Sequence, residues 1–203
     1  MIALVDYGMG NLRSVEKALQ KVGGNVRIVQ KASELKGADR LVLPGVGAFG
    51  DCMRNLNECG MLGGVRDFIQ SGKPFLGICL GYQALFERSE EGAGMQGFGI
   101  FRGNVVRFEP GVLKVPQIGW NQIRFQKPDC PLLRGVADGS HVYFVHSYFP
   151  RPADAGLVAT TTEYATTFAS MIWKDNVFAC QFHPEKSQAV GLKLLENFVQ
   201  LRV

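Results

Sequence analysis

The sequence lacks the features that mark membrane, secreted and fibrous proteins. No apolar run reaches the roughly 20 residues that a membrane helix needs. The opening segment, Met1 to Asp6, has neither the basic region nor the cleavage site of a secretory signal. No repeat or low-complexity run is found. We therefore expect an ordinary globular, cytoplasmic protein with no membrane partner.

Cysteine is present, but its number and spacing exclude structural uses. The cysteines number five and stand at irregular intervals, at positions 52, 59, 79, 130 and 180. Neither a paired disulfide framework nor a zinc-binding spacing fits them. Free thiols without a signal peptide predict a reducing compartment, such as the cytoplasm. We expect no metal ion and no cofactor.

Charge is neither strong nor clustered. The formal net charge is +4, and the Lys and Arg residues form no basic stripe, so we expect no nucleic-acid partner. The small positive excess fits an anionic substrate, an acidic partner or, most simply, an ordinary mixed surface. A chain of 203 residues suits one domain, and we expect residues 1–203 to form a single domain.

The first half of the chain alternates between strand and helix patterns. Short apolar runs predict buried strands at residues 2–6, 26–29, 40–43 and 74–78. Apolar spacing and capping signals predict helices at residues 11–22, 49–70 with a break near Gly60, and 80–87. Such alternation predicts right-handed βαβ units and a parallel sheet.

The second half is dominated by short strand-like runs. They lie at residues 105–108, 118–125, 142–148, 157–162, 168–173 and 177–182, and a last helix is predicted at 189–201. Runs of this kind add antiparallel strands to a parallel sheet. We therefore predict an α/β fold: a three-layer, doubly wound mixed sheet, mostly parallel, with antiparallel additions in the second half.

Cys79 stands between a strand and a helix with a glycine two residues away on each side, at Gly77 and Gly81. This is the nucleophile-elbow pattern, with cysteine in place of serine. The turn lifts the sulfur off the sheet edge and sets it at a helix N-terminus, where a thiolate is favoured. The alternative is a buried cysteine that closes a core strand.

His183-Pro184-Glu185 follows the last strand-like run. A residue before proline is held extended, and positions i and i+2 of an extended segment point the same way. Glu185 can therefore accept a hydrogen bond from one ring nitrogen and leave the other facing a thiol. The alternative is a helix-capping carboxylate beside a surface histidine. The other two histidines, His141 and His146, have no comparable case for catalysis.

A glycine-rich turn, Pro44 to Phe49, follows the third predicted strand. Its backbone N–H groups at Gly45, Val46 and Gly47, with the N–H of Leu80, can form an oxyanion hole beside Cys79. Taken alone, the segment also fits a tight turn without a ligand. A phosphate-binding P-loop is excluded, because the Gly-Lys-Ser/Thr ending is missing.

These motifs together carry a resemblance to a known family. Gly77-x-Cys79-x-Gly81, followed far downstream by His183-Pro184-Glu185, resembles the class I (triad) glutamine amidotransferases. Further segments are similar, more narrowly, to the glutaminase subunits of imidazole glycerol phosphate synthases, namely Asp6–Asn11, Pro44–Phe49, Ile118–Asn121 and His146–Tyr148. They occur in the same order and span most of the chain.

The resemblance implies a reaction and a partner. Cys79 would be the nucleophile, His183 the base and then the acid, and Glu185 the residue that orients His183. Glutamine would be hydrolysed to glutamate and ammonia. The ammonia would pass through a channel to a separate (β/α)₈ cyclase subunit of histidine biosynthesis, where it would react with a phosphoribulosyl formimino-aminoimidazole carboxamide nucleotide.

The resemblance also implies two groups of contact residues. Glutamine contacts would come from Gly47, Gln83, Ser147 and Tyr148. Contacts with the partner subunit would come from Asn11, Trp120, Tyr143 and Lys186.

Two alternatives and one regulatory hypothesis remain. The chain could belong to another triad amidotransferase, such as the glutaminase of pyridoxal phosphate synthase, although residues 6–11 and 118–121 argue against this. It could instead be a non-catalytic or redox-sensing protein in which Cys79 oxidises readily, although the intact His183 and Glu185 argue against that.

Because a glycine-rich turn flips a peptide easily, we also expect the Gly45-to-Gly47 turn to be misaligned until the partner binds its nucleotide.

Overall fold

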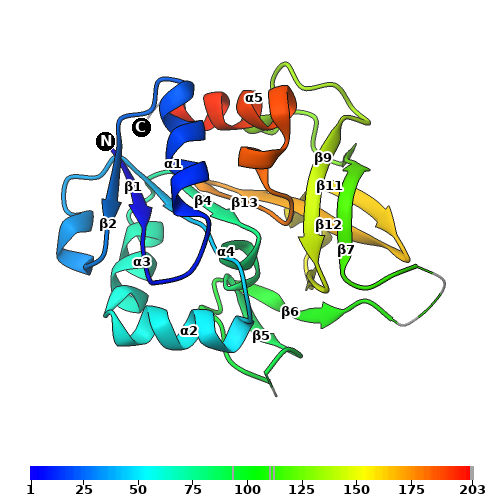
Figure 1. The fold of residues 1–203 in the computed structure, drawn as a ribbon, viewed down its shortest axis with the longest axis horizontal. Coiled ribbons are helices and arrows are strands. Elements are labelled where there is room, and N and C mark those ends of the chain that lie inside the picture. The colour runs from blue at the N-terminus through cyan, green and yellow to red at the C-terminus, as the bar shows by residue number, and fades with distance from the viewer. Residues whose placement is uncertain (93, 110, 112, 202–203) are drawn as a thin grey trace.

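A central sheet of eight strands organises the molecule, with the strand order β2-β1-β3-β4-β13-β12-β11-β8 (Figure 1). The computed structural model describes residues 1–92, 94–109, 111 and 113–201. The strands of this sheet are β1 (Ile2–Val5), β2 (Val26–Val29), β3 (Arg40–Leu43), β4 (Phe75–Ile78), β8 (Arg124–Phe125), β11 (Val158–Tyr164), β12 (Thr166–Lys174) and β13 (Val177–Cys180).

The sheet is parallel at one side and antiparallel at the other. Strands β2, β1, β3, β4 and β13 pair in parallel. Strands β12, β11 and β8 continue it in antiparallel pairs. This confirms the predicted mixed sheet, with its antiparallel strands in the second half of the chain.

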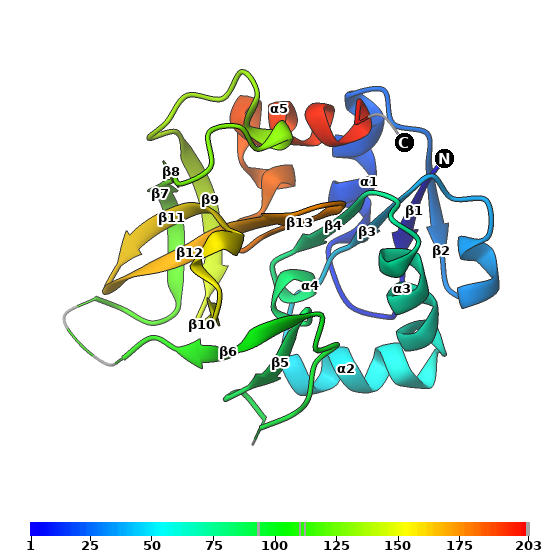
Figure 2. The same ribbon diagram turned by 180° about the vertical axis from the view of Figure 1, so that it is seen from behind.

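Helices cover both faces of the sheet (Figures 1 and 2). Helices α1 (Leu12–Lys21) and α5 (Gln188–Val199) lie on one face, and α2 (Phe49–Glu58) and α3 (Met61–Gln70) lie on the other. Alternate strand residues point to opposite faces. Leu4 and Leu76 therefore join the core beneath α1 and α5, whereas Ala3 and Phe75 join the core beneath α2 and α3.

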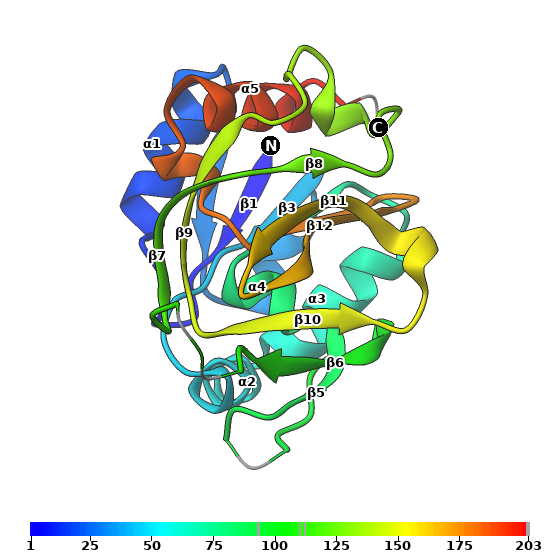
Figure 3. The same cartoon turned by 90° about the vertical axis from the view of Figure 1, so that its right-hand side faces the viewer.

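Two smaller sheets lie beside the antiparallel end of the large one (Figure 3). One has the order β10-β6-β5, made of β10 (Tyr148–Pro152), β6 (Phe101–Arg107) and β5 (Phe86–Ser89). The other pairs β7 (Gln117–Gln122) with β9 (His141–His146) in antiparallel register. Short 3₁₀ turns lie at Ala32–Leu35, Pro131–Leu133, Ala155–Leu157 and Pro184–Lys186. No helix in the described ranges is long and apolar enough to cross a membrane.

The predicted helix at 80–87 is wrong in its second half. Helix α4 comprises only Leu80–Gln83, and strand β5 starts at Phe86. The carbonyls that a longer helix would use are taken by a distant segment: Phe98 N–H donates to Ala84 and Ile100 N–H donates to Leu85. A Cβ at Gly97 would lie 2.3 Å from the Phe86 oxygen, so this close approach requires glycine.

Two predicted strands are each divided. The run at 118–125 breaks at the buried Ile123 into β7 and β8, and the run at 142–148 breaks at Ser147 into β9 and β10. Strand β10 holds Pro150 and Pro152, which weaken a strand pattern in the sequence. It also joins a different sheet from β9, so the break at Ser147 redirects the chain.

Candidate active site

The site lies where three neighbouring parallel strands end. Strands β3, β4 and β13 are adjacent, with Leu43 beside Gly77 and Cys180 beside Ile78. The carboxyl ends of parallel strands meet at one edge of a sheet, where ligands bind in such folds. The three segments that follow these strands, residues 44–47, Cys79 and residues 181–183, are thereby brought together.

Cys79 occupies a strained elbow between β4 and α4. Its φ is +54° and its ψ is −104°, outside the regions that side chains normally adopt. A Cβ at Gly81 would lie 1.9 Å from the Leu43 oxygen, and one at Gly77 would lie 2.8 Å from the Gly81 oxygen. The two flanking glycines are therefore required by the packing of the turn, as the sequence pattern predicts.

His183 and Glu185 form a buried pair. Nδ1 of His183 lies 2.8 Å from Oε1 of Glu185, and their side chains are 2% and 1% exposed. Hydrogen bonds fix the backbone of His183 on both sides. Its N–H donates to the Tyr143 carbonyl at 2.9 Å, and its carbonyl accepts from Ser187 Oγ at 2.6 Å. The ring is thus oriented with Nε2 on its free side.

The electrostatics of the site favour a protonated His183. Burial lowers the pKa of His183, but the Cys79 sulfur and the Glu185 carboxylate outweigh it and raise that pKa to about 10. Nε2 of His183 is buried and has no hydrogen-bond partner in the part of the chain that the structure describes. The Cys79 sulfur thus interacts with His183 strongly enough to raise its pKa, although the geometry at Nε2 is not that of a formed hydrogen bond.

The Pro44-to-Gly47 turn closes over the nucleophile in a specific orientation. The Leu80 N–H donates to the Gly45 carbonyl at 3.3 Å, and the Tyr7 hydroxyl donates to the Pro44 carbonyl at 2.9 Å. A Cβ at Gly45 would lie 2.3 Å from the Tyr7 hydroxyl. The N–H of Leu80, an expected oxyanion donor, is thus already occupied by the backbone of the turn.

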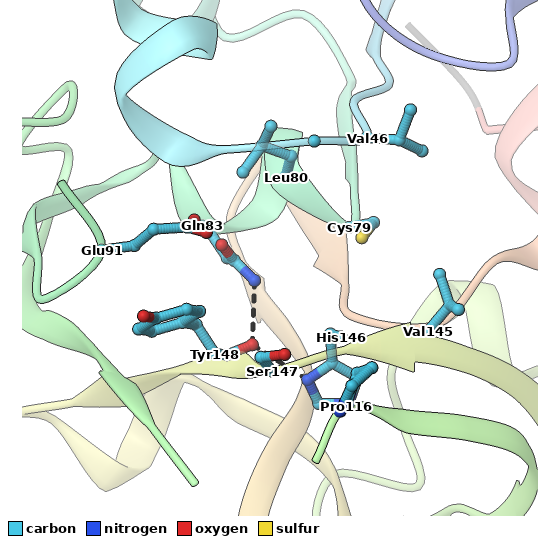
Figure 4. Close-up of a pocket in the computed structure, with 11 residues that line it drawn as sticks. Val46, Cys79, Leu80, Gln83, Glu91, Pro116, Val145, His146, Ser147 and Tyr148 are labelled. Carbon is cyan, nitrogen blue, oxygen red and sulfur yellow. Dashed lines mark hydrogen bonds between the residues drawn. The ribbon is translucent and has the colours of Figure 1, made fainter.

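A cavity of about 250 Å³ opens beside Cys79 (Figure 4). This is below the roughly 300–1,000 Å³ of clefts that take drug-sized ligands, and suits a single amino acid. Its lining comprises Val46, Gly47, Cys79, Leu80, Gln83, Glu91, Pro116, Val145, His146, Ser147 and Tyr148. The predicted glutamine contacts all lie in this lining, whereas Gly45 reaches the site through its carbonyl.

Two polar residues of the site were missed by the sequence analysis. Gln181 is fully buried, and its Nε2 donates to the Cys79 sulfur at 3.6 Å. The parallel pairing of β13 with β4 places it level with Cys79, a signal that becomes visible only once these strands are known to be neighbours. Glu91 also lines the cavity, and its carboxylate accepts from the Phe49 N–H at 2.9 Å.

The predicted partner residues are only partly clustered. The rings of Trp120 and Tyr143 pack edge to face with centroids 5.9 Å apart, and Lys186 Nζ lies 5.8 Å from the Tyr143 ring centroid. Trp120 is 46% exposed and its neighbour Ile118 is 63% exposed. Asn11 is exposed at the start of α1, the helix that contacts the Pro184–Lys186 turn.

Comparison with known proteins defines the class of this site. Residues 3–201 match the family model of class-I glutamine amidotransferases. The chain therefore belongs to the class-I glutamine amidotransferase family. Among solved structures, PurLQS from Thermotoga maritima is similar with a TM-score of 0.77 at 18% identity, covering 97% of this chain and 96% of that one. A structure described as a glutamine amidotransferase is similar with a TM-score of 0.75 at 22% identity, covering 98% and 99%.

Full-length relatives narrow the similarity further. The chain is 53% identical to the imidazole glycerol phosphate synthase subunit HisH of Syntrophotalea carbinolica, with 98% of each chain covered. It is 51% identical to the HisH subunit of Caldanaerobacter subterraneus, covering 99% of this chain and 98% of that one. It is 55% identical to the HisH subunit of Aquifex aeolicus, covering 96% and 94%.

Proposed function

We propose that this chain is the glutaminase subunit of an imidazole glycerol phosphate synthase. It hydrolyses glutamine to glutamate and ammonia and delivers the ammonia to a partner subunit. The observation that carries the proposal is the strained Cys79 beside the buried His183–Glu185 pair, at the edge of a cavity sized for an amino acid. The HisH relatives at about half identity support the particular enzyme.

The reaction proceeds in two half-reactions on Cys79. The sulfur attacks the side-chain amide carbon of glutamine and forms a tetrahedral intermediate. Protonated His183 then donates its Nε2 proton to the departing nitrogen, so that ammonia leaves and a γ-glutamyl thioester remains. Neutral His183 next takes a proton from water as the water oxygen attacks the thioester. The intermediate collapses to glutamate, whose carboxyl proton is lost to solvent, and to the Cys79 thiolate beside protonated His183, which restores the starting state. Glu185 holds the ring and stabilises its charged form.

The glycine-rich turn supports the hypothesis that the resting site is misaligned. The Gly45 carbonyl accepts the Leu80 N–H at 3.3 Å, a donor that the oxyanion needs. Rotation of the Gly45–Val46 peptide releases Leu80 and turns the Val46 N–H toward the cavity. One such donor is worth about 2.7–4 kcal/mol in the transition state, whereas the bond that is broken is worth only about 0.5–1.5 kcal/mol.

The partner is a cyclase subunit with a (β/α)₈ barrel, and the complex is a heterodimer in the cytoplasm. The exposed Ile118 and Trp120, with Tyr143 and Lys186 beside them, provide an apolar centre and a charged rim for docking. Asn11, exposed at the start of α1, is the remaining expected contact. Residues 1–203 act as one glutaminase domain, and no bound cofactor or metal takes part in the reaction.

The test is an assay of glutamate and ammonia release by the chain alone, with the cyclase subunit, and with that subunit and its nucleotide. We expect low activity alone and at least roughly 100-fold stimulation in the loaded complex. A chain that is as active alone as in the complex would contradict the misaligned turn. A Cys79→Ala variant of the complex is the control and should release no glutamate.

Two further measurements separate the alternatives. A glutamine-like diazoketone should add covalently to Cys79 in the complex, and the absence of this adduct would favour a redox-sensing protein. Purified barrel subunits offered in a pull-down distinguish the partner. Capture of a pyridoxal phosphate synthase barrel in place of the cyclase would replace the proposed enzyme with another triad amidotransferase.

A further inference from the structure

His146, the last residue of β9, is a buried histidine that the proposed reaction does not use. It is 6% exposed, and its ring packs against Phe108, Phe144 and Phe168 with centroid separations of 5.2, 5.6 and 5.2 Å. Nδ1 lies 2.9 Å from the Tyr148 carbonyl oxygen, and Nε2 lies 2.9 Å from the atom placed as Oε1 of the Gln117 side-chain amide on β7. Both ring nitrogens are therefore engaged and the ring cannot turn.

The protonation of this ring follows from its partners. Burial lowers the pKa of His146 to about 4, so the ring is neutral at physiological pH and carries a single N–H. A carbonyl oxygen can only accept, so that N–H is on Nδ1 and Nε2 is the acceptor. The Gln117 amide therefore presents its NH₂ group to Nε2, an orientation reached by turning the amide end for end.

The Tyr148 carbonyl is a junction between His146 and the nucleophile. It accepts from Nδ1 of His146 and also from Nε2 of Gln83, both at 2.9 Å (Figure 4). The second N–H of that Gln83 amide donates to Oε1 of Gln181 at 3.1 Å, and Gln181 donates to the Cys79 sulfur. With a neutral His146, each hydrogen bond in this series joins a donor to an acceptor.

The series starts on a strand that is polar inside and apolar outside. Gln117 is 2% exposed, whereas the next residue, Ile118, is 63% exposed. Successive strand residues point to opposite faces, so Gln117 and Ile118 connect the two faces of β7. The buried amides cannot exchange their partners for water without loss, because an unsatisfied buried polar group is costly.

We propose that His146 is a positioning residue, which holds the Ser147–Tyr148 wall of the glutamine cavity and links it, through Gln117, to strand β7. The proposal rests on the proposed function, since the positioned wall is the one that contacts glutamine. His146 acts through the Tyr148 carbonyl, which Gln83 shares. The Ser147 carbonyl is held separately by the Phe108 N–H at 3.1 Å, so loss of His146 displaces the wall at Tyr148 first.

The test compares variants of the complex with the cyclase subunit and its nucleotide. His146→Leu removes both hydrogen bonds of the ring. His146→Asn keeps an amide donor for the Tyr148 carbonyl and shortens the reach toward Gln117. Gln117→Met removes only the bond to β7. We expect His146→Leu to raise the KM for glutamine and lower kcat/KM by roughly 5- to 100-fold, His146→Asn to recover most of the KM, and Gln117→Met to raise the KM by a smaller factor than His146→Leu.

A matched pair of residues on the same two strands provides the control. Gln122 lies beside His141 in the β7–β9 register, as Gln117 lies beside His146. His141 is exposed and neither residue lines the cavity. Gln122→Met and His141→Leu should therefore leave kcat and KM within about twofold of the wild type. Melting temperatures and complex formation, measured for all variants, identify those that are misfolded.

A double variant tests the connection itself. Because Gln117 acts through His146, Gln117→Met should add little to the loss already caused by His146→Leu, and the two effects should be non-additive. Additive effects would overturn the link, and kinetics equal to those of the controls for both His146→Leu and Gln117→Met would overturn the positioning role. An inactive wild-type complex would instead refute the proposed function, and this inference with it.

Discussion

Replacing Glu185 with glutamine removes one negative charge from the site while keeping its shape. In the Glu185→Gln variant, the side-chain carbonyl oxygen can still accept from Nδ1 of His183, because the present distance of 2.8 Å is an ordinary hydrogen bond. The other carboxylate oxygen, Oε2, has no partner among the described residues. The amide nitrogen that replaces it therefore faces no N–H or O–H group that would repel it. The substitution therefore acts mainly on the charge state of His183.

The magnitude follows from the pKa of His183. A rise from 6.5 to about 10 corresponds to about 5 kcal/mol in favour of the imidazolium, at 1.36 kcal/mol for each pKa unit. Glu185 and the Cys79 sulfur both raise this pKa against the effect of burial, so loss of Glu185 removes a large part of the preference for the imidazolium. Loss of the corresponding carboxylate in a serine triad costs about 10⁴-fold in kcat. We therefore expect kcat to fall between about 10²- and 10⁴-fold.

The assay is steady-state glutamate release by the complex, with glutamine varied at several pH values. Glu185 does not line the cavity, so the KM for glutamine should stay within about threefold of the wild type. Glu196→Gln is the control, because Glu196 forms an ion pair with Lys193 outside the cavity and should have little effect. A variant with wild-type kcat, or one whose loss lies entirely in KM, would refute this account of Glu185.

The same pKa gives a second observable, the dependence of stability on pH. The folded-state pKa of His183 lies above its unfolded value, so the stabilisation is complete below about pH 6.5 and is lost as the pH rises toward about 10. Unfolding free energies measured in urea should fall across this window in the wild type. The fall should be smaller in Glu185→Gln, and equal slopes for the two proteins would contradict the assignment.

Two further substitutions test the turn and the elbow. Tyr7→Phe leaves the Pro44 carbonyl without its 2.9 Å donor. We expect the unfolding free energy to fall by about 1–3 kcal/mol and kcat in the complex to fall as well. If neither value changed, Tyr7 would not hold the turn. Gly81→Ala places a Cβ 1.9 Å from the Leu43 oxygen, so urea denaturation should show a loss of more than about 3 kcal/mol. Gly63→Ala, with open space around its Cβ, should instead stabilise α3 by about 0.5–1 kcal/mol.

Local patterns predicted much of the fold and the candidate catalytic residues. The short apolar runs placed β1 to β4 within a residue of their bounds. Strands β1, β3 and β4 are largely buried and apolar, as parallel strands covered on both faces are, whereas the edge strand β2 buries only Val29 of its four residues. Gly77 and Gly81 marked the elbow, because no other residue fits so close to a neighbouring backbone. His183 is extended, as the proline after it predicts, but Glu185 lies in the 3₁₀ turn Pro184–Lys186. The prediction that residues 183–185 form one extended segment was therefore wrong, and the turn brings the two side chains together.

What could not be predicted depends on segments that are distant in the sequence. Strand β5 forms where a helix was expected, because residues 98–101 take the carbonyls of residues 84–86. Gln181 is level with Cys79 only because β13 lies next to β4, after a connection of about a hundred residues. His146 has no sequence signature, since its two partners come from β7 and from the first residue of β10.

The hydrogen bond from the Leu80 N–H to the Gly45 carbonyl fills a donor position of the site with the protein's own backbone. The Gly45 carbonyl accepts the N–H that the oxyanion of the tetrahedral intermediate would need. The turn therefore competes with the intermediate for the same donor, as an inhibitor attached to the chain would. Because this competitor is part of the chain, its local concentration does not depend on the concentration of protein or substrate. In a cell, glutamine would then be hydrolysed only when a partner frees the Leu80 N–H. Ammonia would be released only in a complex that can use it.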